Sequence, residues 1–136
     1  MVLGFQTKEQ VGVEKLGALE IGKHSVYKAT FDSQLVEVTY IPNAAMVGAD
    51  PPASRVLELI NTESDGNGTT VMATLNLTAG VTINAFDKRA LTPSTVPGAL
   101  DVTEGDILAF RSTPVGGTGK ADPSGLVAVT VARRYA

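Results

Sequence analysis

The side chains that could carry catalysis are few in this sequence, and His24 is the most informative of them. It is the single histidine of the chain, and cysteine is absent. One histidine without cysteine excludes a zinc site built on two histidines and any thiolate metal site. A Ser-His-Asp triad needs only one histidine, but no Gly-x-Ser-x-Gly elbow presents a nucleophile. We therefore interpret His24 as a structural or solvent-exposed residue.

A glycine-rich segment, residues 116–120 (Gly-Gly-Thr-Gly-Lys), is similar to part of a phosphate-binding loop. That loop requires Gly-x-x-x-x-Gly-Lys-Ser/Thr leading from a strand into a helix. Here Pro114 occupies the first glycine position, and Ala121 replaces the hydroxyl that would meet Mg²⁺. Pro123 then opposes continuation as a helix. We interpret the segment as a hairpin loop.

Three carboxylates, Asp101, Glu104 and Asp106, lie close together in the sequence. Paired carboxylates can perform acid–base catalysis or hold calcium. The alternative is a solvated turn in which Asp106 accepts hydrogen bonds from backbone amides. Asp65 and Asn67 also offer oxygen ligands, but the EF-hand spacing is missing. The sequence thus predicts a protein that is not an enzyme, with no metal and no cofactor.

The charge balance is mildly acidic, with 11 Lys and Arg against 14 Asp and Glu, a formal net charge of −3. Nucleic-acid binding normally requires a basic footprint, and none is apparent. Two pairs of adjacent basic residues, at 88–89 and 133–134, are typical of solvated strand ends. No apolar stretch is long enough to span a bilayer, and residues 1–8 lack the basic and apolar regions of a secretory signal. We expect neither nucleic acid nor membrane as a partner, and synthesis in a cytoplasm.

Alternation of apolar and polar residues indicates a chain of short β-strands. The Val- and Thr-rich composition favours strands, and the glycines and prolines favour turns. Period-two patterns predict about eight strands and no helix. They cover residues 25–31, 35–41, 55–61, 69–78, 81–91, 100–102, 107–112 and 126–133.

The same alternation predicts which side chains face the core. Tyr27, Ala29 and Phe31 share one face, and the polar tripeptide 32–34 could close a hairpin to the next strand. In the other strands the predicted core faces are Val36, Val38 and Tyr40; Val71, Ala73, Leu75 and Leu77, with Met72 outward; and Val127, Val129 and Val131.

The first 24 residues lack a sustained period and mix glycines with charges. We predict an extended N-terminal arm at 1–24 followed by an all-β domain at 25–136, an antiparallel β-sandwich or jelly-roll-like fold. The alternative is a first strand at 11–16 within the same sheet. Long loops are expected at 42–53, 92–98 and 113–125, where binding or assembly functions commonly reside.

Four short sequence features follow one another in a characteristic order along the chain. They are Ile41-Pro42-Asn43-Ala44-Ala45; Asn61 before a Gly-rich turn and Thr69-Thr70-Val71; Val102 to Phe110 with its Glu-Gly-Asp turn; and Asp122-Pro123-Ser124-Gly125 leading into a strand. Together they resemble the small β-sandwich head decoration, or cement, proteins of tailed bacteriophages. The resemblance covers residues 35–133.

This resemblance implies a virion structural protein, made in the host cytoplasm, that binds the capsid exterior. It implies a homotrimer that clamps neighbouring major capsid protein subunits, without catalytic residues. Shell contact is expected from the arm and assembly contacts from the loops, so deleting residues 1–19 should spare the fold and abolish capsid binding. The alternative is a tail- or fibre-type receptor- or carbohydrate-binding β-sandwich. The arm residues are Val2, Leu3, Phe5, Val11, Val13 and Leu16, and the loop residues are Met46, Pro51, Pro52, Pro93, Pro97 and Pro114.

Overall fold

The computed structural model describes residues 2–13, 21–47, 54–77, 82–115 and 124–135. Within these residues the chain forms twelve β-strands. No described segment is a helix that could cross a membrane. The strands are β1 (Val2–Val13), β2 (Gly22–Lys28), β3 (Ser33–Pro42), β4 (Met46–Val47), β5 (Ser54–Asn61), β6 (Thr70–Leu77), β7 (Thr82–Ile83), β8 (Arg89–Ala90), β9 (Thr92–Pro93), β10 (Asp101–Val102), β11 (Ile107–Val115) and β12 (Gly125–Tyr135).

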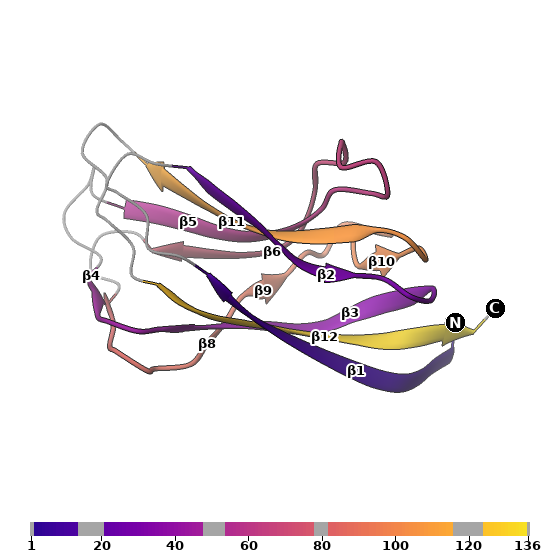
Figure 1. The fold of residues 1–136 in the computed structure, drawn as a ribbon, viewed down its shortest axis with the longest axis horizontal. Coiled ribbons are helices and arrows are strands. Elements are labelled where there is room, and N and C mark those ends of the chain that lie inside the picture. The colour runs from indigo at the N-terminus through magenta and orange to yellow at the C-terminus, as the bar shows by residue number, and fades with distance from the viewer. Residues whose placement is uncertain (1, 14–20, 48–53, 78–81, 116–123, 136) are drawn as a thin grey trace.

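Two antiparallel sheets face each other as the layers of a sandwich (Figure 1). The first sheet has the order β1-β12-β3-β10, and β8 also pairs with β3. The second sheet has the order β2-β11-β5-β6-β9, and β4 pairs with β7 in a separate ribbon. The predicted all-β antiparallel sandwich is therefore confirmed, while its finer assignment as a jelly roll stays a prediction.

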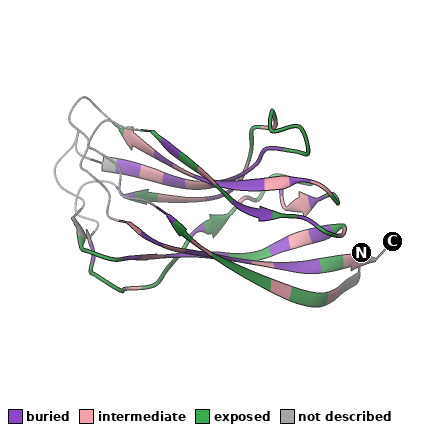
Figure 2. Ribbon diagram, viewed as in Figure 1, coloured by how far each residue is buried: buried purple, intermediate pink, exposed green. Residues whose placement is uncertain are grey.

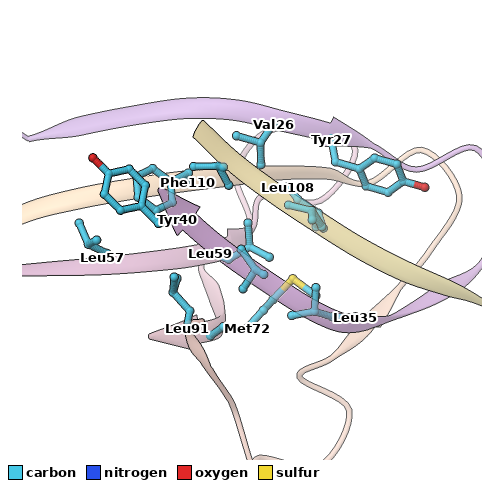
Figure 3. Close-up of a cluster of buried hydrophobic side chains, with 14 of the residues drawn as sticks. Val26, Tyr27, Leu35, Tyr40, Leu57, Leu59, Met72, Leu91, Leu108 and Phe110 are labelled. Atoms are coloured by element: carbon cyan, nitrogen blue, oxygen red, sulfur yellow. The ribbon is translucent and has the colours of Figure 1, made fainter. Parts of the chain in front are cut away.

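The core lies between the two sheets, where buried positions line the facing strands (Figure 2). Val127, Val129 and Val131 of β12 are all buried, as the alternation predicted. Across the sandwich, Tyr40 of the first sheet stacks on Phe110 of the second, with ring centroids 5.4 Å apart (Figure 3). Such stacked aromatic pairs add to the stabilisation from burial alone.

One short segment closes one side of the sandwich by changing sheets. β8 pairs with β3 in the first sheet, and β9 pairs with β6 in the second. Between them Leu91 is buried and its N–H donates to the carbonyl of Val38 at 2.9 Å. The predicted single strand at 81–91 is therefore wrong, as is the assignment of 92–98 entirely to loop. Pairing with two different sheets splits this apolar run into short strands.

The predicted hairpin through residues 32–34 is also wrong, because its two strands lie in different sheets. β2 pairs with β11, whereas β3 pairs with β12 and β10. The connection is held at the crossing by Ala29, whose N–H donates to the Asp106 carbonyl at 2.8 Å. A short polar segment can connect strands in different sheets as well as form a tight hairpin turn. Its composition therefore does not distinguish these two structures.

At two points, irregular pairing between strands changes which side chains face the core. The register between β12 and β3 shifts after Thr130, so Val36 is 38% exposed and Leu35 is buried in its place. The register between β5 and β6 shifts after Leu59, and Met72 is fully buried. A β-bulge adds one residue to one strand and thereby resets the alternation beyond it.

The predicted arm is wrong for residues 2–13 and 22–24, which lie in β1 and β2. β1 pairs with β12 from Val2↔Tyr135 to Val13↔Gly125, so it is the edge strand of the first sheet. Val13 belongs to the core cluster and Val11 packs against it. The alternative, a first strand in the sheet, is correct in kind. β3 covers only one edge of β12, and the other edge accepts the backbone groups of β1.

Tyr27 gives the fold a testable response to alkaline pH. Burial raises the pKa of Tyr27 above its ordinary value. The unfolded chain therefore ionises first, and the stability from keeping Tyr27 neutral is present below about pH 10 and lost as the pH rises further. We expect urea midpoints of the wild type to fall more steeply between about pH 9 and 11 than those of Tyr27→Phe. Parallel pH profiles would contradict this assignment.

Candidate functional site

The candidate catalytic residues do not converge in the described part of the chain. No group of three or more His, Asp or Glu side chains there could hold a metal ion. His24 lies on β2, half-buried and opposite Phe110 of β11. The segment 116–120, interpreted as a hairpin loop, lies outside the described residues.

The three neighbouring carboxylates do not form one site. Asp106 accepts hydrogen bonds at 2.9 Å from the Thr103 backbone N–H and from the Asn61 side-chain amide. Its predicted role as a turn cap is thereby confirmed. Asp101 forms an ion pair with Arg134 at 3.3 Å. Glu104 is exposed, and its backbone N–H is bonded elsewhere. Asp101 and Asp106 therefore stabilise a turn and a strand end in the described structure.

The remaining polar candidates also have local structural contacts. The guanidinium of Arg133 lies 4.6 Å from the ring centroid of Phe31, a cation–π contact. Asp65 accepts a hydrogen bond from the Asn67 backbone N–H at 2.9 Å, and that bond lowers the pKa of the carboxyl. Arg89 forms an exposed ion pair with Asp87 at 3.1 Å.

Residues of the four sequence features contact one another through hydrogen bonds that stabilise the fold. Asn43 binds Ser124 twice, through its side-chain amide at 2.8 Å and its backbone N–H at 2.7 Å. Asn61 binds Asp106 across the second sheet. Residues far apart in the sequence thus fix loops to strands. These positions stabilise this chain's own fold, and a binding surface must be sought elsewhere.

The residues predicted for the arm divide between surface and core. Phe5 is 81% exposed on β1, whereas Val11 is half-buried and Val13 is buried in this chain's own core. Val2 and Leu3 also lie on β1, and Leu16 lies outside the described residues. Among the predicted arm residues whose side chains are described, Phe5 alone is therefore largely exposed to a partner.

The residues predicted for the assembly loops are dispersed. Met46 lies in β4, Pro93 in β9 and Pro114 in β11, while Pro97 is exposed in a turn. β5 and β6 separate β11 from β9 in the second sheet, so Pro93 and Pro114 do not lie on neighbouring strands. Pro51 and Pro52 lie outside the described residues.

Hollows lie along two sheet edges in the described part of the chain. A groove of about 740 Å³ follows β6 and β9 and continues to Ala99; hydroxyl and amide side chains line it together with short apolar ones. A recess of about 500 Å³ lies at the edge of β2, between Glu9 and Ile107.

Sequence reasoning missed an exposed aromatic residue, Phe86, which it placed inside a strand. Phe86 is 74% exposed, in a turn between β7 and β8. The flanking Asn84 and Asp87 are typical turn residues and could have indicated it. In comparisons with known proteins, no family model matches the chain and no curated protein matches it significantly.

Proposed function

We propose that this protein is a capsid decoration, or cement, protein of a tailed bacteriophage. It binds the outer surface of the head as a homotrimer, without a cofactor, and stabilises contacts between major capsid protein subunits. The observation that carries this proposal is the free edge of β1 together with the exposed side chain of Phe5. The proposal also rests on the ordered sequence features at residues 35–133 and on the sandwich fold.

The edge of β1 suits recognition of another protein. β1 is 12 residues long, and β12 is its only pairing partner among the described strands. An unpaired edge offers a row of backbone donors and acceptors to which an extended segment can add as a further strand. The exposed Lys8 and Glu9 offer charge complementarity that would select among partners.

Phe5 adds apolar binding energy to that edge. It lies where the register between β1 and β12 is irregular, between Leu3 and Gln6. Burying such a side chain against a capsid subunit stabilises the contact by about 1.5–3 kcal/mol. In a trimer three such contacts act together, and linked binding events raise the overall affinity well above that of one contact.

Because β1 is part of a sheet, deleting the N-terminal segment is not a suitable test of this function, and a point substitution is needed. Deleting residues 1–19 would remove a paired strand and the buried Val13, so loss of binding would report unfolding as well. We expect the wild type to co-sediment saturably with capsids that lack their decoration protein. Phe5→Ser should retain the fold and bind about tenfold or more weakly, because apolar contact is lost.

The matched control is Val36→Ser, which alters a partly exposed apolar residue of the same sheet on β3. It should bind capsids as the wild type does. A wild-type protein that stays in the supernatant would refute the proposed function, whereas equal binding by Phe5→Ser would refute only the role of β1.

The groove along β6 and β9 favours a second candidate, a tail- or fibre-type domain that binds a receptor or carbohydrate. Thr70, Thr74, Asn76 and Thr92 supply hydroxyl and amide groups of the kind that bind sugar hydroxyls. Saturable binding to a glycan array without co-sedimentation on capsids would favour this candidate over the first.

A further inference from the structure

Phe86 has a backbone conformation that aromatic residues rarely adopt. Its φ is +63°, in the left-handed region. There the Cβ of an L-residue approaches the following carbonyl, which makes the conformation costly for a bulky side chain. Two hydrogen bonds fix the turn: the Phe86 N–H donates to the Pro42 carbonyl at 2.8 Å, and the Asp87 N–H to the Asn84 carbonyl at 3.1 Å.

The side chain does not offset this strain by packing inside the molecule. It is 74% exposed and lies outside the hydrophobic core cluster. Both flanks of the turn are nevertheless anchored, because Ile83 before it and Leu91 after it are buried core residues. The fold thus holds an aromatic side chain in solvent on a rigid base. Strain of this kind concentrates at functional sites, and rigidly presented aromatics are frequent binding hot spots.

The charges around Phe86 indicate the chemistry of its partner. Asp87 and Arg89 form an ion pair and largely offset each other's charge. Lys88, two residues after Phe86, is exposed, so residues 87–89 carry a net positive charge. A complementary site is an apolar pocket with an acidic rim.

We propose that Phe86 is an anchor that inserts into an apolar, acid-rimmed pocket on a major capsid protein subunit. This inference rests on the proposed function. β8 pairs with β3, on the side of the first sheet opposite the free edge of β1 (Figure 1). Phe86 and Phe5 therefore lie toward opposite edges of one sheet, an arrangement that lets one copy contact two neighbouring subunits.

The decisive variant is Phe86→Asn, because asparagine tolerates a positive φ and removes the aromatic ring. The urea midpoint of the isolated protein should be unchanged or higher, since the strain is relieved. Binding to undecorated capsids should weaken about tenfold or more. Phe86→Trp should retain binding, and Val36→Ser, at a partly exposed apolar site of β3, should bind capsids as the wild type does.

A photoreactive phenylalanine analogue at position 86 provides an independent readout. Crosslinking to the major capsid protein is expected, and its absence from capsids that do bind the protein would overturn the proposal. Wild-type capsid binding with equal binding by Phe86→Asn would also overturn it, while leaving the decoration function intact. A lower urea midpoint for Phe86→Asn would show that the ring serves folding instead. Absence of wild-type binding would refute both proposals.

Discussion

Gly125→Ala is expected to lower the free energy of unfolding by about 2–3 kcal/mol, because an added methyl group has no space. A Cβ at this position would lie 2.6 Å from the Ile41 carbonyl oxygen and 2.7 Å from Cε1 of Tyr40. Neither neighbour can retreat easily. The carbonyl belongs to β3, which pairs with β12, and Tyr40 is buried and stacked on Phe110. Urea denaturation followed by circular dichroism measures the loss.

Gly12→Ala is the matched control, since Gly12 lies on β1 beside the same part of β12. Its added Cβ would meet only the Gly125 carbonyl oxygen, at an ordinary contact distance of 3.9 Å. We expect a change within about 0.5 kcal/mol. If Gly125→Ala proves as stable as this control, the close approach of β3 to β12 is not a constraint on folding.

Periodicity predicted those parts of the fold where pairing is regular. The alternation of Val127, Val129 and Val131 survives because β12 keeps one register along that stretch with β1. It failed at Val36 and Met72, where a bulge supplies the extra residue. A bulge depends on how two strands fit together, and neither strand's own sequence records it.

Long-range pairing was the second limit. The segment 2–13 shows little alternation of its own, and it becomes a strand because the open edge of β12 pairs with it. The chain changes sheets at residues 29–32 and within residues 89–93, which is a property of the whole topology. Local patterns specify that a segment can extend, and only the assembled sheets specify its neighbour.

For the candidate site too, local sequence predicted some side-chain positions, and strand pairing and turn geometry determined the others. Sequence reasoning selected Phe5 for a partner contact, and the structure leaves that side chain exposed. It selected Val13 for the same reason, but β1 turns Val13 into the core. Phe86 was overlooked because an apolar residue in an apolar run is typical of a buried strand. Its exposure follows from a left-handed turn, which the sequence marks only through neighbouring polar residues.

Asp106→Ala is expected to destabilise the protein by about 2–4 kcal/mol, since one carboxylate oxygen serves two donors. Oδ2 of Asp106 accepts from the buried Asn61 amide and from the Thr103 N–H, each at 2.9 Å. Alanine would leave both donors without this acceptor. The turn that carries Asp106 also extends the pairing of β2 with β11, because the Asp106 carbonyl accepts from the Ala29 N–H at 2.8 Å. Thermal and urea unfolding should both show the loss.

Asp106→Asn separates the acceptor from the charge. An amide oxygen in the position of Oδ2 can still accept from Thr103 and Asn61, so we expect a smaller loss, about 1 kcal/mol, from the weaker uncharged bonds. Equal losses in the two variants would mean that the negative charge matters more than the hydrogen-bond geometry. An Asp106→Ala variant within about 0.5 kcal/mol of the wild type would mean that water replaces the carboxylate and that this joint contributes little to folding.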